Sequence, residues 1–141
     1  MEPLDLTKRP PRGPREEADG LFFLPRTIDK ARARLPGGNP GVYNMAGFSE
    51  RLLEHIGVTE SDFIEAVAIA NTDHDVVRWL KENAQLEKYA EVAERIKNRK
   101  LSDVTDLAAF KERYPILKGR PDLVYLVDML EADDAEMFPD A

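Results

Sequence analysis

Apolar residues recur at helical spacing over most of this chain, and capping residues separate one such stretch from the next. Thr59 precedes one stretch with Asp62 three residues on, and Thr72 stands in the same relation to Asp75, a spacing typical of helix N-termini. Gly57 directly follows an earlier stripe, at the position where a glycine commonly ends a helix. The pattern therefore predicts a succession of short helices joined by tight turns.

The fold class follows from the surface that each apolar stripe has to pack against. Thr27 is expected to cap the first helix, residues 85–100 to form the longest, and Pro121 to open the last. No segment alternates polar and apolar residues as paired strands do. Since each stripe needs another helix to cover it, the sequence predicts an all-α fold, a single compact bundle of about six short helices.

The two ends of the chain differ from its middle. Residues 1–20 are rich in proline and arginine and cannot propagate a helix, so an extended N-terminal arm is expected there. Leu4 and Leu6 alternate with Asp5 in this arm, which predicts that the arm docks on the body. The helical domain is expected over residues 21–132, followed by a solvated acidic tail over residues 133–141.

Composition excludes several classes of function. The chain has no cysteine, so disulfides, thiol nucleophiles and thiolate metal sites are excluded. The net charge of −7 disfavours binding to a phosphate backbone, so nucleic acid is not an expected partner. No apolar run is long enough to span a membrane and no export signal is evident, so a cytoplasmic protein is expected. A homodimer would rest on base rates alone.

One passage carries a candidate ligand site. Between Leu24 and Tyr43, basic side chains lie beside the glycine loop "PGGNPG", and such groups with loop N–H donors can gather a phosphate or carboxylate. A structural interpretation is favoured, because cations in the last turn of a helix already complement its dipole and Asp29 can pair with Arg32. The candidate ligand-binding residues are Arg26, Asp29, Lys30, Arg32, Asn39 and Tyr43.

Other chemical signals are thin. The chain has only two histidines: His55 lies at the edge of an apolar stripe, and His74 in "TDHD" sits in what reads as a capped helix start. Trp79 is expected in the core. We therefore expect no catalytic residue, no metal and no cofactor.

Three runs resemble a known family: "LDLTKRPPRGPRE", then "LPRTIDKARARLPGGNPGVY", and finally "RPDLVYLVDMLEADDAEMF". They are similar to the bacterial family called domain of unknown function 5069, most clearly at residues 4–57 and 120–138. The name implies that no activity is established for the family. The resemblance therefore implies a folded domain and names no reaction.

Two classes of function remain. A non-catalytic binding or interaction protein is favoured, because no nucleophile lies near a base and the serines lack the glycines of a nucleophile elbow. The alternative is a small enzyme or accessory subunit that binds an anionic metabolite through the Arg26–Tyr43 segment, with Tyr43 or Asp29 transferring a proton. An exposed apolar patch would favour the first class, and convergent charges in a pocket would favour the second.

Overall fold

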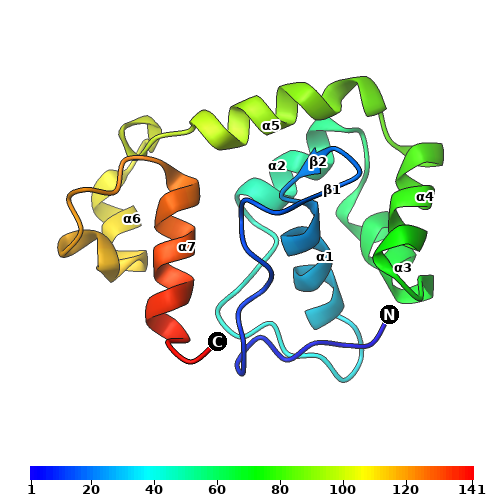
Figure 1. Ribbon diagram of the computed structural model, residues 1–141, viewed down its shortest axis with the longest axis horizontal. Coiled ribbons are helices and arrows are strands. Elements are labelled where there is room, and N and C mark those ends of the chain that lie inside the picture. Colours follow the sequence, from blue (N-terminus) through cyan, green and yellow to red (C-terminus); the bar gives the residue numbers. More distant parts are fainter. The chain divides into compact units, whose positions relative to one another are not determined.

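The computed structural model describes residues 1–141 and is mostly helical, with seven α-helices and one two-stranded sheet (Figure 1). The mostly helical prediction is confirmed, while the small sheet was not expected. A single bundle was also expected, but the internal contacts divide the chain into two units, Met1–Ala93 and Glu94–Ala141. None of the helices combines the length and the apolar character needed to cross a bilayer.

The first unit holds the sheet and four complete helices. Strands β1 (Glu17–Ala18) and β2 (Leu21–Phe22) form an antiparallel hairpin. The helices that follow are α1 (Leu24–Ala33), α2 (Phe48–His55), α3 (Glu60–Ile69) and α4 (Asp73–Asn83). A 3₁₀ turn, η1 (Leu86–Lys88), leads into α5 (Tyr89–Asn98), which crosses from the first unit into the second.

The second unit contains two 3₁₀ turns, η2 (Leu101–Asp103) and η3 (Pro115–Lys118), and two helices, α6 (Leu107–Arg113) and α7 (Leu126–Met137). Residues 85–100 do not form the longest helix. They divide into the 3₁₀ turn η1 and helix α5, and α7 is longer than α5. The last helix begins at Leu126 and not at Pro121, since the backbone N–H of Leu126 bonds instead to the carbonyl of Arg99 at 3.0 Å. The acidic end of the chain is helical as far as Met137.

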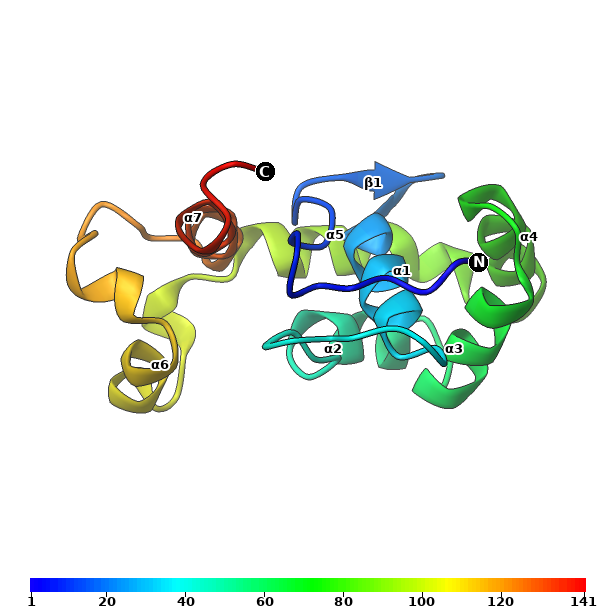
Figure 2. The ribbon, with the colours of Figure 1, turned by 90° about the horizontal axis from the view of Figure 1, so that it is seen from below.

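Helix α1 forms the centre of the first unit and is buried on almost every side. All of its residues except Arg32 are buried, including three charged ones. It packs against α3 and β1, and the arm crosses it in Figure 2. A helix enclosed in this way must satisfy its polar side chains inside the protein.

The start of α1 corrects one prediction. The helix begins at Leu24, after Phe23 adopts a positive φ of 75°, so Thr27 lies inside the helix and does not cap it. Its hydroxyl lies 3.1 Å from the carbonyl oxygen of Phe23, four residues back, and 3.0 Å from the hydroxyl of Ser49. Thr27 therefore joins α1 to α2 through a buried polar contact.

The remaining capping predictions are confirmed. The Thr59 hydroxyl accepts a hydrogen bond from the backbone N–H of Asp62, and Thr72 forms a complete capping box with Asp75. Gly57 follows α2 with a positive φ of 80°. These residues fix where α2 ends and where α3 and α4 begin.

The arm docks on α1 and on the glycine loop that follows it. Leu6 is 1% exposed, and its backbone N–H donates to the carbonyl of Asn39 at 2.8 Å. Asn39 in turn donates to Leu4 at 2.9 Å, and the Leu4 N–H donates to Arg32 at 3.3 Å. These contacts fit the expected docking of the two leucines, while the domain boundaries near residues 20 and 132 stay a prediction.

Candidate functional site

Arg26 and Tyr43, at the two ends of the predicted ligand segment, come together in the structure. Helix α1 places Arg26 in the interior, where it is 1% exposed. Its guanidinium carbon lies 5.6 Å from the ring centre of Tyr43 and 5.9 Å from that of Phe23, within cation–π range. Its Nη1 also donates to the carbonyl oxygen of Arg12 at 3.2 Å. The Arg26 cation is thus held by aromatic faces and by the arm.

Asp29 is engaged by a residue of the arm. Its fully buried carboxylate accepts from the backbone N–H of Arg12 at 2.8 Å and from the Arg12 side chain at 3.0–3.2 Å. The same guanidinium also binds Asp73, at the start of α4. The hydrogen bond to Asp73, followed by the interactions with Asp29, raises the pKa of Arg12 above its ordinary value. Arg12 therefore compensates the buried charge of Asp29 and ties α1 to α4.

The other predicted residues of this segment lie around these contacts. The Lys30 ammonium lies 5.6 Å from the ring centre of Phe23, on the same aromatic residue that Arg26 contacts. Arg32 donates through Nε to the carbonyl of Glu2 at 2.8 Å, and exposed Asn39 accepts through Oδ1 from the N–H of Gly41 at 3.0 Å. The structure thus gives each predicted residue an internal contact, and their role toward a ligand stays a prediction.

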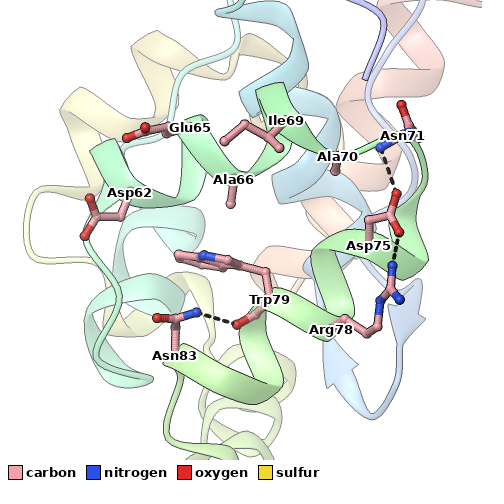
Figure 3. Close-up of a pocket in the computed structure, with 10 residues that line it drawn as sticks. All are labelled: Asp62, Glu65, Ala66, Ile69, Ala70, Asn71, Asp75, Arg78, Trp79 and Asn83. Atoms are coloured by element: carbon pink, nitrogen blue, oxygen red, sulfur yellow. Dashed lines mark hydrogen bonds and ion pairs between the residues drawn. The ribbon is translucent and has the colours of Figure 1, made fainter.

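A second site lies between α3 and α4, which a short turn connects. These helices enclose an open groove of about 650 Å³. Figure 3 shows the Trp79 side chain in the groove, facing Ala66 of α3, with Ile69 on the same helix. The full lining is Asp62, Glu65, Ala66, Ile69, Ala70, Asn71, Asp75, Arg78, Trp79 and Asn83. We call this the Trp79 groove.

Four apolar residues line the Trp79 groove: Ala66, Ile69, Ala70 and Trp79. Ile69 is 76% exposed, which is the largest exposed fraction among the big apolar side chains that lie open to solvent. Trp79 is half-buried, and Asn83 donates through its side-chain amide to the Trp79 carbonyl at 2.9 Å. Trp79 was expected in the core, but it instead forms part of a surface that solvent reaches.

Charged residues also line this groove. Asp75 accepts from the backbone N–H of Asn71 at 2.9 Å and forms an ion pair with Arg78. The Asn71 hydrogen bond, followed by the contact with Arg78, lowers the pKa of Asp75. The positive charge of Arg78 is therefore matched within the groove, and the exposed carboxylates of Asp62 and Glu65 leave it with an acidic rim.

A smaller hollow of about 420 Å³ lies between α2 and the start of α3. Its apolar floor includes the buried side chains of Leu53 and Val58. No basic side chain lines it, and three of its residues carry exposed carboxylates; the full lining is Glu50, Leu53, Glu54, Gly57, Val58, Thr59 and Glu60. The hollow and the Trp79 groove share the first turn of α3, and both are acidic at their rims.

Sequence reasoning missed the Trp79 groove. The apolar stripe of α3 includes Phe63 and Val67, which are buried, and Ile69 lies off that stripe. An isoleucine on the polar side of an amphipathic helix was the available signal. The structure contains no group of three or more histidine, aspartate or glutamate side chains placed to hold a metal ion.

Comparison with known proteins identifies the family. The family model described as "Domain of unknown function (DUF5069)" matches residues 8–136, so the chain belongs to this family. No curated protein matches the chain. Because the family description names no activity, a function has to be argued from the sites described above.

Proposed function

We propose that this member of the DUF5069 family is a non-catalytic interaction protein that binds a segment of a polypeptide partner in the Trp79 groove. The observation that carries the proposal is the position of Ile69, 76% exposed, in the same groove as Trp79. Single exposed aliphatic residues are ordinary on protein surfaces. An exposed aliphatic residue and a tryptophan that line the same groove offer an apolar side chain of a partner a place to bury.

The form of the groove favours a polypeptide over a small molecule. Sites for small molecules enclose most of the ligand surface, whereas this groove is open enough to leave Ile69 largely in solvent. An open groove between two helices, with the amide side chains of Asn71 and Asn83 in its lining, suits an extended or helical segment. We also place this function in the cytoplasm of a bacterium, on the basis of the charged composition and the resemblance to a bacterial family.

The alternative, an enzyme or accessory subunit that binds an anionic metabolite at the Arg26–Tyr43 segment, has less support. Arg26 is buried between aromatic rings, and the carboxylate of Asp29 is occupied by Arg12. A ligand there would have to displace these internal contacts. A thermal-shift screen with phosphorylated and carboxylated metabolites tests this alternative, since a ligand at about 100 times its Kd stabilises by roughly 2.7 kcal/mol.

A displayed library of random peptides of about 15 residues, long enough to cross the groove in an extended form, tests the proposed function. Peptides selected on the full chain should bind Ile69→Lys at least about tenfold more weakly, because the variant replaces the most exposed apolar side chain of the groove by a charge. The matched control is Leu86→Lys, which changes another exposed aliphatic residue outside the groove. Equal affinity for both variants, or no enrichment of any peptide, would contradict the proposal.

A further inference from the structure

We infer that the partner segment is basic, and that it passes from the Trp79 groove over the first turn of α3 into the acidic hollow between α2 and α3. This inference rests on the proposed function, because it specifies the charge and the path of the segment that the groove binds. Three observations support it: the charges of the two sites, their shared turn, and the positions of two carboxylates in their helices.

The charges of the two sites are unbalanced. Asp75 and Arg78 neutralise each other, so Arg78 does not offset the rest of the rim. The other acidic residues are exposed and form no ion pair within the protein: Asp62 and Glu65 in the groove, and Glu50, Glu54 and Glu60 in the hollow. Five negative charges therefore face the path of the proposed segment, and lysine or arginine side chains are their natural complement.

The two sites are adjacent on α3. Thr59 and Glu60 belong to the hollow, while Asp62, two residues further along the same turn, belongs to the groove. Residues two apart on a helix lie on nearly opposite sides of it, so the segment has to pass around the start of α3. Half the circumference of a helix about 10–12 Å across is roughly 16–19 Å, which about five or six residues of extended chain span. A single short segment can therefore contact both sites.

Helix stability explains some of these carboxylates but not all of them. Glu50 and Glu60 lie in the first turns of α2 and α3, where a negative charge complements the helix dipole. Glu54 lies in the last turn of α2, where a negative charge is unfavourable, and Glu65 lies in the middle of α3. Neither has an internal cation. A positively charged partner would pair with both carboxylates, for which the isolated chain has no cation.

The composition and salt dependence of the peptides selected above test the inference. Peptides that lose affinity for Ile69→Lys should contain an excess of lysine and arginine around an aromatic or aliphatic residue. Their affinity should fall as salt is raised, because contacts between exposed charges are screened beyond about 10 Å at 0.1 M ionic strength. The double variant Glu54→Gln/Glu65→Gln, with one change in each site, should weaken binding about tenfold at low salt.

The matched control is Glu17→Gln/Glu87→Gln, which removes two exposed carboxylates outside both sites. It should change the affinity less than twofold, which is less than about 0.4 kcal/mol. Groove-dependent peptides that are neutral or acidic, or that bind the Glu54/Glu65 variant unchanged, would overturn the inference and leave the proposed function standing. Basic peptides that bind Ile69→Lys as well as the parent protein would overturn both, since charge alone would then explain binding. The absence of enriched peptides would also overturn both.

Discussion

Replacing Arg12 should destabilise the first unit much more than replacing a surface arginine. The Asp29 side chain is 1% exposed, and Arg12→Gln removes the three side-chain contacts at 3.0–3.2 Å that compensate its charge. Breaking one side of a buried ion pair costs about 3–5 kcal/mol. The backbone N–H of residue 12 still donates to Asp29, and Arg32 remains at 3.8 Å, so we expect a smaller loss of about 2–4 kcal/mol.

The assay can use the only tryptophan of the chain, which lies in the first unit. Urea unfolding followed by Trp79 fluorescence gives the free energy of unfolding of the variant and of the parent protein. The matched control is Arg78→Gln, which breaks an ion pair whose arginine is 65% exposed and should cost at most about 1 kcal/mol. Arg12→Lys should fall between the two, because a lysine keeps the charge and loses the forked geometry.

A double variant separates the loss of compensation from a loss of packing. In Arg12→Gln/Asp29→Asn the buried group is neutral, so the combined loss should be smaller than the sum of the two single losses. The reasoning would be refuted by two results: a loss for Arg12→Gln no larger than that for Arg78→Gln, or strictly additive single variants.

Three further predictions concern stability. Gly38→Ala should cost about 1–3 kcal/mol in urea unfolding, because its Cβ would lie 2.5 Å from the carbonyl oxygen of the last residue of α1; Gly119→Ala, with open space around it, is the control, and equal losses would contradict the reasoning. Thr27→Val should lower the free energy of unfolding by about 1–3 kcal/mol, because the buried Ser49 hydroxyl loses this partner. Adding Ser49→Ala should recover part of the loss, and no recovery would argue against the contact. The pKa of Asp75 is lowered in the folded state, so its carboxylate stabilises the protein at pH values above the pKa of the unfolded chain and loses this effect as pH falls below about 4. The difference in melting temperature between the parent protein and Asp75→Asn should therefore shrink as pH falls through that range. A difference that stays constant with pH would contradict the prediction.

Local signals were the part of the fold that the sequence could predict. Thr59 and Thr72 cap helices through bonds to residues three positions on, and Gly57 ends a helix through its own φ, so each acts within one turn. The predicted start of α1 was wrong because it depends on contacts distant in the sequence. Phe23 adopts a positive φ while fully buried, a conformation that tertiary packing imposes and that no neighbouring residue indicates.

The sites depended on distant contacts and were predicted less well. The charged residues of α1 were recognised as a group, but the partner of Asp29 is Arg12, seventeen positions away in a segment without a helical period. Trp79 lies on an apolar stripe, and its exposure is set by how α4 lies against α3. Periodicity identifies the face that a helix buries and does not indicate how far a large side chain remains open.

The contact between Arg12 and Asp73 also has a consequence for the order of events during synthesis. The two residues are 61 positions apart, so at about 5–20 residues per second Arg12 is made roughly 3–12 s before Asp73. Asp29 appears much sooner, only 17 positions after Arg12. The arm can therefore attach to α1 through the Arg12–Asp29 ion pair before α4 has been synthesised. Asp73 then adds to an Arg12 side chain that is already positioned.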